Sequence, residues 1–109
     1  MRLAYAIKYV ADMDKAVAFH RDTLGLELKF ASPFWSEFAT GETTLALHAA
    51  DADHPPGKVQ LGFNSGDLAA FYETRETNGV TFTAPPTPMH GATIARFLDC
   101  EGAETSISG

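Results

Sequence analysis

The side chains of this sequence that could do chemistry are few and widely spaced. It has four histidines, His20, His48, His54 and His90, and one cysteine, Cys100. An imidazole can bind a metal or transfer protons, and a thiolate can act as a nucleophile. No histidine lies beside Cys100 in the sequence, and no catalytic Ser/His/Asp motif or phosphate-binding glycine loop occurs. We therefore expect Cys100 to be an ordinary residue of a turn and not a catalytic thiol.

Among the other candidates, each has a structural alternative. His48 lies at the end of an expected strand, where a surface or hydrogen-bonded role competes with a ligand role. His90 lies in the proline-rich segment 85–91, which we expect to be a loop that arches over a cavity. Arg96 lies in a later strand and can bind an anion or form a salt bridge. His20 belongs to a helix stripe and His54 to a linker, so we expect packing for the first and no function for the second.

The element that organises the chain is a helix between two strands. Asp12 is a suitable N-cap, because its carboxylate can accept from the free N–H groups of the first turn. Gly25 suits the left-handed position that ends a helix. Between them, apolar and packing residues recur at helical spacing at Met13, Ala16, Val17, His20 and Leu24. Alternating patterns before and after this helix predict strands over 3–10 and 26–30.

The pattern then repeats. Further strands are expected over 34–39 and 43–49, then, after the polar segment 51–57, over 58–64. A second helix begins after Asp67 and ends at Asn78-Gly79, and strands follow over 80–84, 92–99 and 103–108. The order β-α-β-β-β thus occurs twice, in a module of about residues 1–50 and a module of about 58–109. We predict a single α+β domain over 1–109 that arose by duplication.

The composition excludes several classes of function. The chain has 109 residues and a formal net charge of −6, and it lacks any basic run. Nucleic acids and anionic membranes need clustered Lys and Arg, so neither is an expected partner. No apolar run reaches the roughly 20 residues of a membrane span. A lone cysteine and the lack of a signal-peptide pattern predict a cytoplasmic location.

The sequence resembles the vicinal oxygen chelate superfamily, also called the glyoxalase/bleomycin-resistance/dioxygenase group. Five stretches carry the resemblance, and they are residues 10–13, 18–25, 61–68, 78–80 and the turn 97–102, which has Cys100 where the family usually has Pro. The resemblance implies two tandem βαβββ modules that form half-open β-barrels around a cavity. It also implies a homodimer and, in the glyoxalase type, a divalent metal held by four inward His, Glu or Gln side chains.

Matched to the family pattern, the four ligand positions fall at Tyr5, Leu47, Gln60 and Ser106. Only Gln60 is a ligand type that the family uses, since Leu cannot bind a metal and Tyr and Ser are poor ligands. A shift of the fourth strand by one residue would present His48 instead of Leu47, and a shift of the last strand would present Glu104. The alternative metal set is therefore His48, Gln60 and Glu104, but the expectation is that no metal or other cofactor is bound.

Three hypotheses follow. The favoured one is a metal-free, bleomycin-resistance-like protein that binds a small planar or aromatic molecule. The second is a metal-dependent lyase or dioxygenase with the shifted ligand set, and the third is an interaction module whose sheet face a partner fills. The residues expected to contact the ligand are Tyr5, Trp35, Leu47, His48, Gln60, His90, Arg96 and Ser106. Tyr9, Leu45 and Asn64 are expected to line the same pocket, and Phe34, Phe38 and Met89 its rim or a dimer interface. Glu37 is expected to face solvent unless its face is the cavity.

Overall fold

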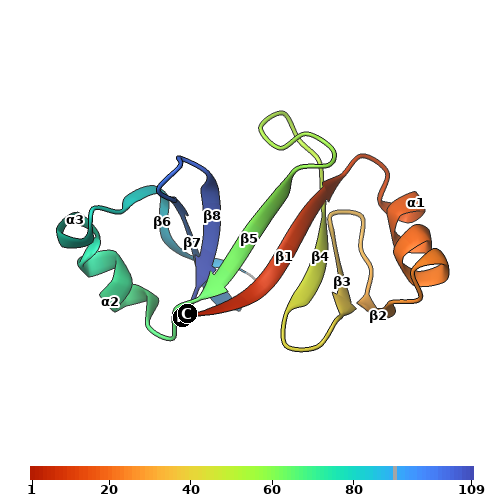
Figure 1. Cartoon of the computed structure of the whole chain (residues 1–109), viewed down its shortest axis with the longest axis horizontal. Coiled ribbons are helices and arrows are strands. Elements are labelled where there is room, and N and C mark those ends of the chain that lie inside the picture. The colour runs from red at the N-terminus through yellow and green to blue at the C-terminus, as the bar shows by residue number, and fades with distance from the viewer. Residues whose placement is uncertain (90) are drawn as a thin grey trace. The chain divides into compact units, whose positions relative to one another are not determined.

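The computed structural model describes residues 1–89 and 91–109, and it divides them into two compact units. The first unit is Ala4–Gln60, and the second consists of Met1–Leu3 and Leu61–Gly109. Two successive βαβββ modules make up the chain (Figure 1). The first module has β1 (Arg2–Val10), α1 (Met13–Ala18), the π-helix η1 (Phe19–Thr23), β2 (Glu27–Phe30), β3 (Trp35–Ala39) and β4 (Thr44–Ala49). The second has β5 (Val59–Asn64), α2 (Leu68–Glu73), α3 (Arg75–Asn78), β6 (Thr81–Met89), β7 (Ala92–Leu98) and β8 (Glu104–Ser108).

Both modules have the same strand order, which confirms the predicted α+β fold of tandem βαβββ modules. In the first module the order is β2-β3-β4-β1, and β1 runs parallel to β4. In the second the order is β6-β7-β8-β5, and β5 runs parallel to β8. The remaining neighbours within each module are antiparallel. The first strand of each module therefore returns beside its last strand.

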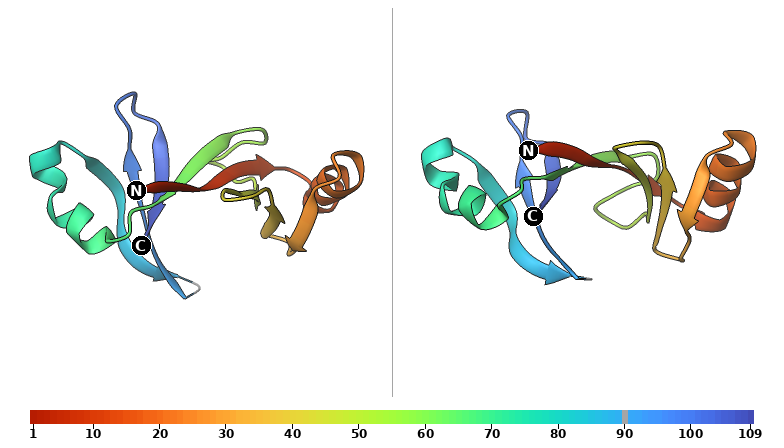
Figure 2. Two further views of the ribbon diagram at one scale, coloured as in Figure 1. Left: turned by 60° about the horizontal axis from the view of Figure 1, so that its bottom comes forward. Right: turned by 90° about the horizontal axis from the view of Figure 1, so that it is seen from below.

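The helix boundaries are set by the residues predicted to set them. The Asp12 carboxylate accepts from the Lys15 N–H at 3.1 Å, and the Asp67 carboxylate accepts from the Ala70 N–H at 3.0 Å. Gly79 has a φ of 69°, which is the left-handed conformation that ends the second helical segment without a Cβ clash. This segment is broken at Thr74 into α2 and α3 (Figure 2). Among the described residues, none of the helices has the length and hydropathy of a membrane span.

The expected loop over 85–91 is mostly a strand, so this prediction is wrong. Residues up to Met89 continue β6, which is the edge strand of its module. Proline lacks an N–H donor, and an edge strand tolerates it because one side of the strand needs no partner. The pairing of β6 with β7 shifts register between Ala84 and Thr87, where Pro85 and Pro86 lie. His90 lies outside the described residues, so its expected role over a cavity stays a prediction.

Each module packs its helices against one face of its sheet. In the first module this core contains Val10, Val17, Phe38 and Leu47, with Leu45 packed against it. In the second it contains Leu68, Ala95 and Ile107, surrounded by the rings of Phe63, Phe71, Phe82 and Phe97. Phe38 is fully buried in this core, so its expected position at a pocket rim or dimer interface is wrong, whereas Phe34 and Met89 are exposed.

Candidate functional site

The face of the first module opposite α1 carries polar and aromatic side chains. Strand alternation and register determine which residues share it, because Tyr9 pairs with His48 and His48 pairs with Trp35 across three neighbouring strands. In the next row, Ile7 pairs with Ala46 and Ala46 with Glu37. We call the set of Tyr5, Tyr9, Trp35, Glu37 and His48, together with His54 of the adjoining loop and Gln60 of β5, the polar-aromatic face; all lie in the unit Ala4–Gln60.

Trp35 forms a fixed wall of this face. Its indole N–H donates to Glu37 Oε2 at 2.8 Å, and Glu37 is buried. Lys29 Nζ lies 3.5 Å from the other carboxylate oxygen of Glu37. The Tyr5 ring meets the indole edge-on at a centroid distance of 5.9 Å. Glu37 therefore does not face solvent, and it holds the indole in one orientation.

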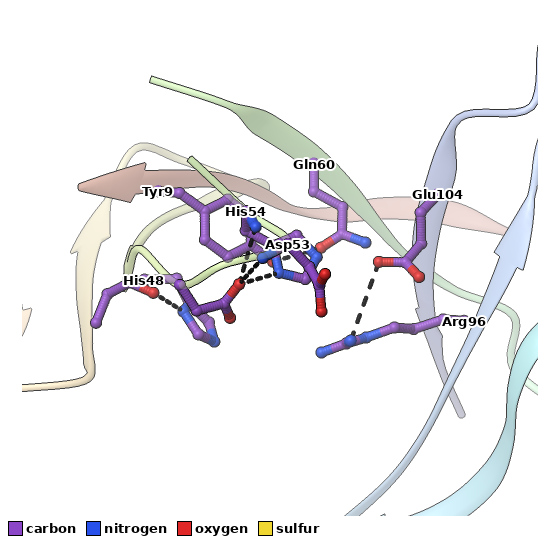
Figure 3. A network of polar contacts seen from close by, with 9 residues as sticks. Tyr9, His48, Asp53, His54, Gln60, Arg96 and Glu104 are labelled. Atoms are coloured by element: carbon purple, nitrogen blue, oxygen red, sulfur yellow. Dashed lines mark hydrogen bonds and ion pairs between the residues drawn. The ribbon is translucent and has the colours of Figure 1, made fainter. Parts of the chain in front are cut away.

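Tyr9 and Gln60 form the buried polar centre of the face. The Tyr9 hydroxyl donates to Gln60 Oε1 at 2.7 Å, and the two residues are 1% and 2% exposed (Figure 3). A hydrogen bond in such a buried position is strengthened by the low local dielectric, and its loss is correspondingly costly. Gln60, the one position that kept a ligand type of the family, thus uses its amide oxygen to accept from a protein side chain.

The linker contributes a residue that sequence reasoning missed. His54 is 7% exposed, and its ring stacks on Tyr9 at a centroid distance of 4.5 Å and an interplanar angle of 9°. Asp51 Oδ1 lies 2.9 Å from His54 Nδ1 and also accepts from the backbone N–H groups of Asp53 and His54. An Asp followed by a short Pro-rich segment is typical of such a side-chain-closed turn. That signal was present in the sequence, but it indicates a turn and not a contact with Tyr9.

His48 lies between Tyr9 and Trp35. Its ring centroid is 4.8 Å from that of Tyr9 and 5.8 Å from that of Trp35. Its Nδ1 is 2.7 Å from the carbonyl oxygen of Ala49. The register of β4 thus presents His48 on the polar-aromatic face.

Leu47 lies on the opposite side of β4. It is fully buried against Val10, Val17 and Phe38 in the core beneath α1, and Leu45 packs there too. Adjacent residues of a strand point to opposite faces, so a strand that presents His48 to one face must present Leu47 to the other. We therefore remove Leu45 and Leu47 from the residues that can line a pocket on the polar-aromatic face.

The second module carries its own polar group. Arg96 Nη1 lies 4.0 Å from Glu104 Oε1 (Figure 3). The Thr83 hydroxyl donates to Glu104 Oε2 at 3.1 Å. Arg96 therefore has a salt-bridge partner in Glu104. A salt bridge was the role predicted as the alternative to binding an anion. Ser106 pairs with Arg96 across β7 and β8 and is partly buried. Asn64, at the end of β5, donates to Ser108 at 3.5 Å.

The remaining histidine and the cysteine lie elsewhere. His20 is buried on the helix side, where its Nδ1 is 2.7 Å from the Ala16 carbonyl oxygen and its ring is 5.7 Å from that of Phe38. The packing role expected for His20 is confirmed. Cys100 is exposed in the turn between β7 and β8.

An open groove lies on the helix side of the first unit and has a volume of about 450 Å³. It contains none of the residues predicted to contact a ligand. Its lining residues are Met13, Asp14, Val17, Arg21, Leu28, Ala31, Ser32 and Pro33.

The donor set of the first unit fits a metal poorly. Among the described residues, no group of three or more His, Cys, Asp or Glu is placed to hold an ion. On the polar-aromatic face the family-type donors are Glu37, His48, His54 and Gln60. Three of them already have partners: Glu37 accepts from Trp35, His54 Nδ1 contacts Asp51, and the Gln60 oxygen accepts from Tyr9. Protein sites for zinc normally supply three or four donors. The third residue of the alternative set, Glu104, belongs to the other unit.

The contact between Asp51 and His54 is expected to make the stability of the protein depend on pH. Hydrogen bonding to His54 lowers the pKa of the Asp51 carboxyl below its usual value, with smaller contributions from the backbone N–H groups of Asp53 and His54. A carboxyl whose pKa is lower in the folded state adds stability above its unfolded pKa, about 4, and loses it as the pH falls through the folded pKa. We expect Asp51→Asn to flatten the fall in stability below about pH 4, measured by urea unfolding at several pH values.

Asp53→Asn is the matched control, because Asp53 contributes its backbone N–H to the turn and the substitution removes the same charge from the same loop. An acid response that changes equally in both variants would show that loop charge alone, rather than the Asp51–His54 contact, determines it.

Comparison with known proteins gives one consistent result. The sequence model of the Glyoxalase/Bleomycin resistance protein/Dioxygenase superfamily matches residues 2–107. The chain is 30% identical over 103 residues to the uncharacterized protein YetH of Bacillus subtilis, covering 86% of each sequence. It is 37% identical over 82 residues to an uncharacterized protein of Mycolicibacterium smegmatis, covering 72% of this chain and 69% of that protein.

Solved structures show the same fold at low identity. A methylmalonyl-CoA epimerase variant of Streptomyces coelicolor, in complex with 2-nitronate-propionyl-CoA, superposes with a TM-score of 0.82 at 19% identity, covering 99% of this chain and 93% of that one. A superfamily member from Vibrio splendidus superposes with a TM-score of 0.67 at 18% identity, covering 98% and 96%. Since the family model matches nearly the whole length, the chain belongs to the glyoxalase/bleomycin resistance protein/dioxygenase superfamily.

Proposed function

We propose that this protein binds a small organic molecule on the polar-aromatic face and that it does so without a metal ion. The observation that supports this most directly is the hydrogen bond from Tyr9 to Gln60 Oε1. Gln60 is the only residue of a family ligand type at the four matched positions. The bond from Tyr9 occupies its amide oxygen in a contact between protein side chains. Around it, fixed aromatic rings and a few polar atoms give the profile of a small-molecule site.

A single reporter makes this proposal testable. Trp35 is the only tryptophan of the chain and lies on the face itself. We expect its fluorescence to change when an aromatic probe such as naphthol binds, and we expect the affinity to be the same before and after treatment with a chelator. Elemental analysis of the purified protein should find no stoichiometric divalent metal. About one metal per chain, lost in His48→Ala, would contradict the proposal.

A second candidate function is a metal-dependent lyase or dioxygenase that uses His48, Gln60 and Glu104. One observation favours it, because the contact between His48 Nδ1 and the Ala49 carbonyl oxygen orients Nε2 in the way common among metal-bound histidines. The metal measurement above separates it from the favoured function. His90, Arg96 and Ser106 remain proposed ligand contacts in either case, as do Tyr5 and Trp35.

The assembly and location are part of the same proposal. Closure of half-open barrels in this superfamily, as the resemblance implies, favours a homodimer, and the composition favours a cytoplasmic location. Light scattering at micromolar concentration should give twice the chain mass of 11.7 kDa, and the chain mass itself would contradict the dimer.

A further inference from the structure

We infer that His48 determines the specificity of this face, and that its ligands are flat aromatic molecules that are not anionic and carry an O–H or N–H donor. The inference rests on the proposed function, because it assigns a chemical class to the molecule that the face binds.

The contact that His48 makes with the backbone determines which ring nitrogen carries the proton. Nδ1 lies 2.7 Å from the Ala49 carbonyl oxygen, and a carbonyl oxygen can only accept a hydrogen bond. Nδ1 therefore carries the proton. In a neutral imidazole the other nitrogen, Nε2, is then an acceptor with a lone pair.

Nε2 of His48 is accessible to a ligand. Within residues 1–89 and 91–109, no hydrogen bond to Nε2 of His48 is found. The same described residues contain no buried side-chain nitrogen or oxygen that lacks a partner. Since His48 is only partly buried, Nε2 can be reached from solvent. A bound molecule that donates to it would replace a water and would keep the nitrogen hydrogen-bonded.

The aromatic rings next to His48 have fixed orientations. The Trp35 ring stands nearly perpendicular to the His48 ring, at 87°, and the bond to Glu37 holds it there. Tyr5 meets Trp35 at 64°. Such edge-to-face rings leave flat apolar surfaces, on which an aromatic molecule can pack. Because the indole is already fixed, a ligand loses little free energy in ordering it.

The charged groups near the polar-aromatic face limit the charge that a ligand can carry. Glu37 accepts from the indole N–H and has Lys29 as its ion-pair partner, and Asp51 and Asp53 lie in the adjoining loop. The chain as a whole has a net charge of −6. Carboxylates near a site disfavour anionic ligands, so an uncharged donor group is compatible with this charge. An aromatic O–H or N–H group meets all these conditions.

The test compares naphthol with its methyl ether, which has the same ring system but no O–H donor. For the unmodified protein, we expect naphthol to bind about tenfold more tightly, the usual effect of one hydrogen bond. In His48→Phe the ring remains but the acceptor is lost, so both probes should bind equally. His20→Phe is the matched control, because His20 has the same Nδ1 contact with a carbonyl oxygen but lies on the helix side, and it should keep the preference for naphthol.

A measurement on the unmodified protein makes the test independent of whether the variants fold. At equal occupancy, the NMR chemical shift of His48 Nε2 should move much further when naphthol is added than when the methyl ether is added. Equal affinity of the unmodified protein for both probes would overturn the inference and leave the proposed function intact. Failure of both probes to bind would overturn this ligand class, whereas a stoichiometric metal lost in His48→Ala would overturn the proposed function itself.

Discussion

Leu47→Ala should lower the free energy of unfolding by about 2–5 kcal/mol, the usual cost of truncating a buried leucine. Leu47 is fully buried against Val10, Val17 and Phe38, so the substitution leaves a cavity beneath α1. Its side chain does not reach the polar-aromatic face, and probe affinity should therefore be unchanged. Urea unfolding and a Trp35 fluorescence titration measure the two quantities on one protein sample.

His48→Ala, the neighbouring substitution, should have the opposite profile. His48 is only partly buried, so we expect a loss of about 1 kcal/mol in stability, typical of such sites. Naphthol affinity should fall, because the acceptor nitrogen is removed. The pair tests the register of β4 directly: if Leu47→Ala weakened binding and His48→Ala destabilised the core, the strand would be shifted by one residue.

Tyr9→Phe should lower the free energy of unfolding by about 1–3 kcal/mol, because it removes a buried hydrogen bond to Gln60 Oε1. The phenyl ring keeps the stack on His54, so the effect reports the hydroxyl alone. Urea unfolding measures it. Tyr5→Phe is the control, since Tyr5 is less buried and its contact with Trp35 is made by the ring.

A double-mutant cycle completes this prediction. Gln60→Met keeps the size of the side chain and removes the acceptor, and the double variant should cost less than the sum of the two single variants. Strict additivity would mean that the Tyr9–Gln60 bond does not contribute to stability.

The fold could be predicted from local signals because several of them agreed. Asp12 and Asp67 cap the two helical segments as expected, and alternation located every strand. The exception is the segment after Ala84, where three prolines indicated a loop. Proline forbids only a central strand, and the sequence does not state which strand lies at an edge. That depends on pairing between distant residues.

The site was harder to predict for the same reason. Whether Leu47 or His48 faces the aromatic residues depends on a register of one residue, and both choices are compatible with the local pattern. His54 gave no signal of its own, because its role arises from a turn closed by Asp51 and a ring contributed by Tyr9, far away in sequence. The role of Glu37 likewise depends on its hydrogen bond with the Trp35 indole, two residues away on the same strand face.

The prolines of β6 have a consequence for solubility and assembly. An edge strand usually offers a row of N–H and C=O groups to which another chain can add a strand, and this is a common route to aggregation. Pro85, Pro86 and Pro88 have no N–H group, so the outer strand of the second module offers fewer of those donors. A sheet continued from one subunit into the next at this edge is therefore disfavoured, and association of two chains is expected to depend on side-chain packing elsewhere.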